Sequence, residues 1–138
     1  TDIYSSVITK NKLIIVVCDN GGFAVINRLQ LFKGGKEYNN LLKSSNTPGL
    51  VDVDFAKHAE SMGAKSEHVN SISDLEAAFK RAKASDVTYV ISIKTHAYKW
   101  VEGSAFWDSP TLEIPTTKEN EEALKLYKEG KGKQRQGV

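Results

Sequence analysis

A polar, glycine-rich corner follows an apolar run near the start of the chain. Residues 13–18 are Leu-Ile-Ile-Val-Val-Cys, and Asp-Asn-Gly-Gly follows at positions 19–22. The side-chain oxygen of Asn20 and the backbone carbonyl of Gly22 are hard, neutral donors, which Mg²⁺ accepts when a diphosphate supplies further oxygens. Backbone N–H groups at the start of the next helix could contact that phosphate. The corner is therefore a candidate magnesium and diphosphate site.

The same corner also has a simpler explanation. Asn and Gly tolerate a positive φ, so a sharp turn after a strand would require the same residue types. The G-x-G-x-x-G pattern of dinucleotide-binding sites is absent. From these residues alone, a ligand site and a plain turn both remain open.

The run from Leu13 to Cys18 predicts a strand that is buried on both faces, because six consecutive residues are apolar. The corner then lies at the carboxyl end of that strand, which is the edge of open α/β sheets where ligands bind. Cys18 has no evident base beside it in the sequence. We therefore expect a packed thiol and not a nucleophile.

Further helices and strands follow in alternation along the chain. The predicted strands are 64–69 and 87–93. Five helices are predicted. The first covers residues 2–9, the second runs from the corner to Gly34, and the third runs from a cap at Asp54 to Gly63. The fourth begins with a capping box at Ser73 and Glu76, and the fifth runs from a capping box at Thr116 and Glu119 to near Gly130. Strands that alternate with helices indicate right-handed crossovers, so the predicted fold class is α/β, with a parallel sheet flanked by helices.

The length of 138 residues suits one domain over 1–138. Within it we expect a flexible loop over 36–53, where Asn, Ser, Pro and Gly are frequent, and an aromatic segment and helix over 94–138. His96 lies just after a predicted strand, where substrate groups could come near. The aromatic residues of this segment fit a lid over a ligand or, alternatively, a hydrophobic cluster or subunit contact. These residues are Tyr98, Trp100, Phe106 and Trp107.

Composition excludes several classes of function and location. The formal net charge of +2 is too small to argue for a nucleic-acid or acidic-membrane partner. One cysteine cannot form an internal disulfide, and no apolar stretch approaches the length of a membrane span or signal-peptide core, so we expect a reducing cytoplasm. The chain starts without Met in helix-like sequence, so we expect it to be part of a longer polypeptide.

The order of these segments resembles a known family. Asp2 to Val7, Leu13 to Cys18 and the corner resemble the second half of the diphosphate-binding motif of thiamine diphosphate enzymes, which starts with Gly-Asp-Gly and closes on Asn-Asn before a turn. Val53 to Ala64 and Ser73 to Ile93 look like the helices and final strand that follow in these enzymes. Within that superfamily, hydrolases of inositol catabolism are similar to this chain over residues 18–30, 32–35, 38–42 and 133–138.

The resemblance implies which residues bind the cofactor, thiamine diphosphate. They are Asn20, Gly21, Gly22, Phe23, Ala24 and Val25. Asn20 would ligate Mg²⁺ through its side chain and Gly22 through its carbonyl, the N–H groups around Phe23 and Ala24 would approach the diphosphate, and Val25 would flank the cofactor. Asp19 stands where many members have Asn. We expect its charge to point away from the diphosphate and to bond backbone N–H groups.

The resemblance also implies that part of the site lies elsewhere. The Gly-Asp-Gly segment and the first strand would precede Thr1, and the glutamate that activates the cofactor belongs to another domain. We therefore expect residues 1–138 alone to be inactive, and to need the N-terminal domains of the same polypeptide in a homodimer or homotetramer. For the whole enzyme, the implied reaction is hydrolytic cleavage of a carbon–carbon bond in a cyclic polyhydroxy 1,2-dione from inositol degradation. The catalytic residues stay unknown.

Two other interpretations stay open. An acetolactate synthase-like enzyme or a decarboxylase would share the corner but would differ between Val25 and Lys33. A non-catalytic α/β binding module would use the corner only as a turn.

Overall fold

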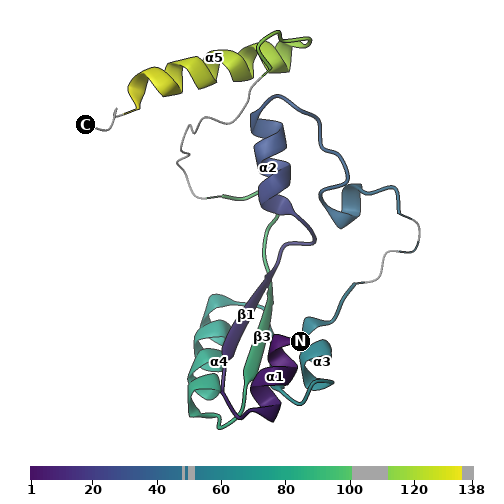
Figure 1. Cartoon of the computed structure of the whole chain (residues 1–138), viewed down its shortest axis with the longest axis vertical. Coiled ribbons are helices and arrows are strands. Elements are labelled where there is room, and N and C mark those ends of the chain that lie inside the picture. Colours follow the sequence, from purple (N-terminus) through teal and green to yellow (C-terminus); the bar gives the residue numbers. More distant parts are fainter. Residues whose placement is uncertain (48, 50–51, 101–111, 135–138) are drawn as a thin grey trace. The chain divides into compact units, whose positions relative to one another are not determined.

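The computed structural model describes residues 1–47, 49, 52–100 and 112–134 (Figure 1). The chain divides into two compact units, and each is described by itself below. The described residues of the first unit, Thr1–Asn20 with Gly49–His96, form three strands and the helices α1 (Asp2–Ile8), α3 (Phe55–Glu60) and α4 (Ile72–Ala84). The second, Gly21–Pro48 with Ala97–Val138, contains α2 (Ala24–Phe32), a 3₁₀ helix (Leu42–Ser44) and α5 (Lys118–Lys133).

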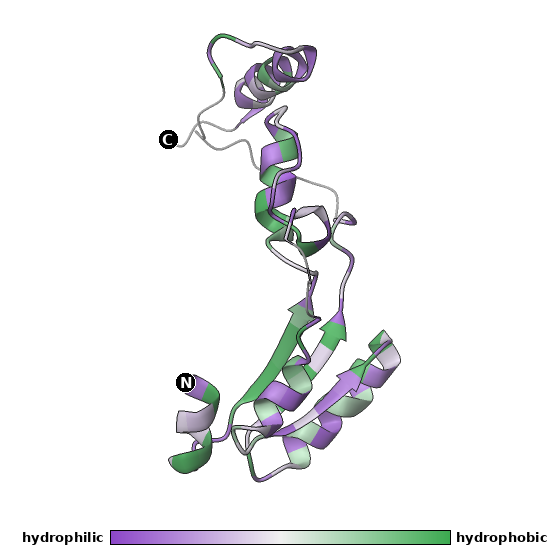
Figure 2. Ribbon diagram, turned by 90° about the vertical axis from the view of Figure 1, so that its right-hand side faces the viewer, coloured by the Kyte–Doolittle hydropathy of each residue, from purple (hydrophilic) through white to green (hydrophobic). Residues whose placement is uncertain are grey.

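The strands of the first unit form one parallel sheet. They are β1 (Ile14–Asp19), β2 (Lys65–Val69) and β3 (Tyr89–Lys94), in the order β1-β3-β2. The central β3 is buried from Tyr89 to Ile93. The hydropathy colours in Figure 2 follow the sequences, since the apolar β1 is green and the polar β2 is largely purple. The predicted α/β class with a parallel sheet is confirmed.

Helices cover both faces of this sheet. On one face, Ala78 and Ala82 of α4 pack against Ile91 and Ile93 of β3 in a buried cluster. On the other face, a second cluster contains Val90 of β3 and residues of α1 and α3. Figure 1 shows α4 on one side of the strands, with α1 and α3 on the other. None of the helices in the described ranges is long and apolar enough to cross a membrane.

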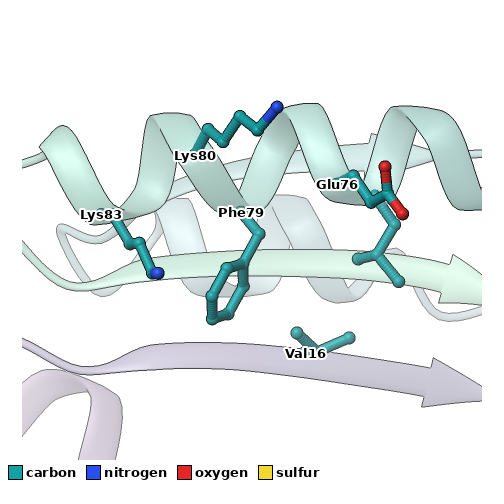
Figure 3. A pocket seen from close by; sticks show the side chains of 6 residues that line it. Val16, Glu76, Phe79, Lys80 and Lys83 are labelled. Carbon is teal, nitrogen blue, oxygen red and sulfur yellow. The ribbon is translucent and has the colours of Figure 1, made fainter.

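The prediction that β1 is buried on both faces is wrong. In the described part of the chain β1 is the edge strand, and Val16 and Cys18 are exposed on the face that carries α4. Because α4 packs mainly over β3, a groove of about 390 Å³ stays open beside β1. Phe79 points from α4 toward Val16 across this groove (Figure 3). The Cys18 thiol is consequently not the packed group that the apolar run predicts.

Two of the predicted helix caps shift by one or two residues. Asp54 caps α3 as predicted, and its carboxylate accepts a hydrogen bond from the Lys57 N–H at 3.0 Å. The cap of α4 is Ser71 in place of Ser73, and the cap of α5 is Thr117 in place of Thr116. At each of these residues an extended backbone lets the hydroxyl oxygen accept from the N–H three residues on. Helix α5 also continues past Gly130 to Lys133.

The second unit joins the corner to part of the predicted loop. Gly22 and Leu41 form an isolated antiparallel bridge, in which the Leu42 N–H donates to the Gly21 carbonyl at 2.9 Å. The Phe23 N–H donates to the Asn40 carbonyl at 2.7 Å. Leu41 is only 1% exposed. The stretch from Asn40 to Leu42 is thus held against the corner by backbone hydrogen bonds and by burial of one apolar side chain.

Helix α5 packs near the end of α2. The side chain of the buried Asn120 donates to the Gly34 carbonyl at 2.9 Å, and the Lys33 ammonium lies 4.8 Å from the ring centre of Tyr127. These contacts connect residues more than eighty positions apart. They explain why α5 belongs to the same compact unit as α2.

A charged cluster ties α4 to the sheet. The carboxylate of Glu67 on β2 accepts two hydrogen bonds from the Arg81 guanidinium, at 2.6 and 3.0 Å, and one from the Tyr89 hydroxyl at 2.7 Å. The Arg81 hydrogen bond, followed by that of Tyr89, holds the pKa of Glu67 below its ordinary value. One residue therefore connects β2, β3 and α4.

Replacing Glu67 with Gln removes the charge but keeps the shape. Because the folded-state pKa of Glu67 is lowered, its stabilisation is present above the ordinary pKa of about 4.3 and is lost as the pH falls through the folded value. We expect Glu67→Gln to lower the melting temperature by about 2–4 °C at pH 7, and by less below pH 4. Circular dichroism melts of the 138-residue chain measure this. Glu60→Gln, at an exposed site on α3, is the matched control; an equal effect in both variants would contradict the assignment.

Replacing Gly22 with Ala tests the bridge between corner and loop. The added Cβ would lie 2.5 Å from the Asn40 carbonyl oxygen, and Gly22 has a φ of +150° that side chains rarely adopt. We expect Gly22→Ala to open the bridge, so that the Phe23 and Leu42 amides exchange with solvent about tenfold faster or more. Hydrogen exchange of the 138-residue chain measures these rates.

The neighbouring glycine provides the control. A Cβ on Gly21 would meet nothing within 4 Å, although its φ of +75° carries a cost of about 1 kcal/mol. Gly21→Ala should therefore slow or speed these amides much less than Gly22→Ala. Unchanged exchange in Gly22→Ala would show that the bridge does not depend on the glycine.

Candidate functional site

Polar residues gather at the carboxyl edge of the sheet in the first unit. Asp19 is the last residue of β1 and pairs in register with Lys94, the last residue of β3. The Thr95 N–H donates to the Asp19 carbonyl at 2.8 Å, which extends the ladder by one bond. Asn20 follows directly and is partly buried. The parallel register thus places the predicted metal ligand at the strand ends, as the sequence predicts.

Lys94 joins two carboxylates at this edge. Its ammonium lies 2.6 Å from Asp19 Oδ2 and 2.7 Å from Asp52 Oδ1. The side chain of Asp19 is 11% exposed, whereas that of Asp52 is 81% exposed. The Asp19 carboxylate, followed by that of Asp52, raises the pKa of Lys94 to about 12. The Asp19 carboxylate thus has a charged partner on the neighbouring strand.

The remaining predicted cofactor residues begin the second unit. Gly21 and Gly22 both have positive φ, at +75° and +150°. Phe23 precedes α2 and is 72% exposed, and Ala24 is the buried first residue of that helix. The Phe23 N–H is engaged by Asn40, whereas that of Ala24 lies in the first helical turn, where N–H groups have no partner within the helix.

The start of α2 presents apolar side chains to solvent. Phe23 is followed by Val25 and Ile26, each 52% exposed. Three exposed apolar groups around one helix start form a surface that a nonpolar ligand or another protein segment could cover. Val25, which the resemblance implies would flank the cofactor, is one of these three residues.

A polar network on α2 does not stand out in the sequence. Asn27 is 1% exposed and donates through Nδ2 to the Glu37 carboxylate at 3.2 Å, and the Tyr98 hydroxyl donates to the same carboxylate. Gln30 accepts from the Asn40 side chain and donates to the Lys36 carbonyl. The spacing of Asn27 and Gln30 could have indicated this network in the sequence, because residues three apart lie on the same face of a helix.

The aromatic and histidine candidates make the following contacts. Trp100 lies against the Arg28 guanidinium, 5.1 Å from the ring centre, and Tyr98 lies under the Lys43 ammonium at 4.1 Å. His96 is exposed at the end of the first unit. Phe106 and Trp107 fall outside the described residues, as do the final residues 135–138. Within the described ranges, no three His, Cys, Asp or Glu side chains are grouped as metal ligands would be.

Comparison with known proteins gives a family match and a set of relatives. Residues 2–93, two-thirds of the chain, match the family model for the C-terminal TPP binding domain of thiamine pyrophosphate enzymes. A 3D-(3,5/4)-trihydroxycyclohexane-1,2-dione hydrolase of Bacillus licheniformis is 30% identical over 129 residues, which is 93% of this chain and 20% of the relative. The hydrolase of the same name from Lacticaseibacillus casei is 34% identical over 120 residues, 86% of this chain and 18% of the relative.

A solved structure supports the same fold. The thiamine diphosphate-dependent 4-hydroxybenzoylformate decarboxylase of Rhodococcus jostii RHA1 superposes with a TM-score of 0.53 at 26% identity, over 68% of this chain and 16% of that protein. The chain spans about a fifth of the length of the curated relatives it matches. The matched region contains the corner, α2 and the whole sheet except Lys94, the last residue of β3. The chain belongs to the family of C-terminal TPP-binding domains of thiamine pyrophosphate enzymes.

Proposed function

We propose that this chain binds the diphosphate and Mg²⁺ of thiamine diphosphate within a longer hydrolase, which cleaves a carbon–carbon bond of a cyclic polyhydroxy 1,2-dione. The observation that carries the proposal is the family match over residues 2–93, which contains the whole corner at the carboxyl edge of a parallel sheet. The substrate class is supported by relatives of about 30% identity that share most of this chain's length. We further propose a role in inositol degradation, which the resemblance of the sequence implies.

The residues at the corner fit a magnesium–diphosphate group. Asn20 and Gly22 offer neutral oxygens, and the described residues contain no cluster of His, Cys, Asp and Glu that would hold a metal without further ligands. Such a partial set suits Mg²⁺, which commonly takes its remaining oxygens from a bound phosphate, from water and from one or two carboxylates. We propose that the side-chain oxygen of Asn20 and the carbonyl of Gly22 are the protein ligands in this chain.

The start of α2 would complete the binding of the diphosphate. The N–H groups of its first turn, beginning at Ala24, point out of the helix, and the helix dipole favours a negative charge at this end. The exposed side chains of Phe23 and Val25 would cover apolar parts of the cofactor and exclude water. Once bound, thiamine diphosphate supplies the carbanion stabilisation that carbon–carbon cleavage requires.

A decarboxylase is the second candidate. The structural match to a decarboxylase of the same cofactor family favours it, because that protein shares the fold over 68% of this chain. The hydrolase relatives, however, are similar over up to 93% of the chain. We therefore rank the hydrolase first. We further propose that the enzyme is a cytoplasmic homodimer or homotetramer, whose N-terminal domains supply the other half of each site.

Loss of the Asn20 amide should weaken cofactor binding. In the full-length protein, we expect thiamine diphosphate with Mg²⁺ to raise the melting temperature by about 5 °C or more, and Asn20→Ala to remove most of this shift. Differential scanning fluorimetry measures both. Asn70→Ala is the matched control, because Asn70 follows β2 at the same edge of the sheet and is exposed. It should keep the full shift.

The isolated chain provides a second comparison. Residues 1–138 contain only part of the proposed metal shell, so the chain alone should show little cofactor-dependent shift. An unchanged shift in Asn20→Ala would contradict the ligand assignment, and a large shift for residues 1–138 alone would contradict the proposed division of the site.

The reaction itself is tested by product analysis. With thiamine diphosphate and Mg²⁺, we expect the full-length protein to convert 3D-(3,5/4)-trihydroxycyclohexane-1,2-dione to a ring-opened acid without release of CO₂, as followed by NMR. Samples without the cofactor are the control. Release of CO₂ from 4-hydroxybenzoylformate, or formation of acetolactate from pyruvate, at a higher kcat/KM would favour the decarboxylase or synthase instead.

A further inference from the structure

We propose that Lys94 is a positioning residue for the cofactor: by pairing with Asp19, it allows a carboxylate to stand next to the metal ligand Asn20 without repelling the diphosphate. This inference rests on the proposed function, and it concerns one residue of the corner and two residues outside it. These are Asp19, Asp52 and Lys94.

The first argument is the geometry of the pair. Parallel pairing of β1 with β3 puts Asp19 opposite Lys94, and the ammonium reaches Asp19 Oδ2 at 2.6 Å. The carboxylate is largely shielded from solvent, with 11% of the side chain exposed. Asn20 is the next residue, so its Cα lies about 3.8 Å from that of Asp19. A charge on Asp19 is therefore close to any group that Asn20 binds.

The second argument is electrostatic. Mg²⁺ neutralises a diphosphate only in part, so the magnesium–diphosphate group that would bind at the corner keeps a net negative charge. An unpaired carboxylate within about 8 Å, at the effective dielectric of a protein surface, would weaken the binding of a unit negative charge by about tenfold or more. Asn at position 19 would avoid this repulsion. In this chain position 19 is Asp, and the Lys94 ammonium from the neighbouring strand neutralises its charge and so reduces the repulsion.

The third argument concerns the other partner of Lys94. Asp52 lies 2.7 Å from the same ammonium, but its side chain is 81% exposed. Solvent and salt therefore screen its charge well. Asp52 connects the segment before α3 to the strand ends, and its removal leaves the pair of Lys94 and Asp19 in place. Asp52 thus offers a variant that loses one ion pair without exposing the charge beside Asn20.

The test measures cofactor affinity in the full-length protein. The dissociation constant of thiamine diphosphate at saturating Mg²⁺ is determined by isothermal titration calorimetry for Lys94→Met, Lys94→Arg, Asp52→Asn and the double variant Asp19→Asn/Lys94→Met. We expect Lys94→Met to raise Kd about tenfold, and less at 0.5 M KCl, where the charges are screened. The other three variants should stay within about twofold of the unaltered protein.

Each result contradicts a different part of the inference. If Lys94→Met leaves Kd unchanged, or if the double variant binds as weakly as Lys94→Met, then Lys94 does not act by neutralising Asp19 and the inference is overturned. A loss in Asp52→Asn equal to that in Lys94→Met would assign the effect to the segment before α3. If the unaltered full-length protein does not bind thiamine diphosphate, the proposed function fails as well. Melts of each variant without cofactor show whether folding is preserved.

Discussion

The strand β3 is hydrogen-bonded on both sides, and the rest of the first unit depends on this ladder. It places the ends of β1 and β3 at one edge, where Asp19 and Lys94 are in register. It also provides the buried residues against which α4 packs on one face, and α1 and α3 on the other. A slip of one residue would turn each side chain of β1 to the opposite face and would separate Asp19 from Lys94. Burial of the two faces of β3 therefore determines the register that brings Asp19 to Lys94, as well as the packing of the core.

The fold was largely predictable because local signals and tertiary packing agree. β-branched runs, glycine stops and capping residues lie close to the observed ends of the strands and helices, and α4 and α5 differ mainly in which hydroxyl caps them. The apolar run of β1 was misleading for a physical reason. Its composition is that of an internal strand of a parallel sheet, yet among the described residues it has a neighbour on one side only. The composition of a strand indicates whether its two faces can be buried. It does not indicate which other strands pair with its edges.

The sequence predicts candidate site residues only where a ligand-type side chain and a local backbone signal occur at the same place. Asn20, Gly21 and Gly22 stand out because a sharp turn and an oxygen donor occur together at a strand end. The contribution of Lys94 could not be predicted, because it depends on a register between strands separated by about seventy residues. The network of Asn27 and Glu37 likewise requires a loop to return to α2, which no local pattern specifies. Long-range pairing thus determines the polar partners, whereas short-range sequence determines the ligand candidates.

The open groove beside β1 has a practical consequence for anyone who prepares this chain. It leaves Val16 of β1, the edge strand among the described residues, and Phe79 of α4 in contact with water, with Cys18 exposed on the same strand. An apolar edge strand readily pairs with another copy of itself, and an exposed thiol can then link the copies on oxidation. Concentrated samples of the 138-residue chain should therefore self-associate unless a reductant is present and the concentration is low. Polar replacement of Val16 offers a direct route to a better-behaved sample.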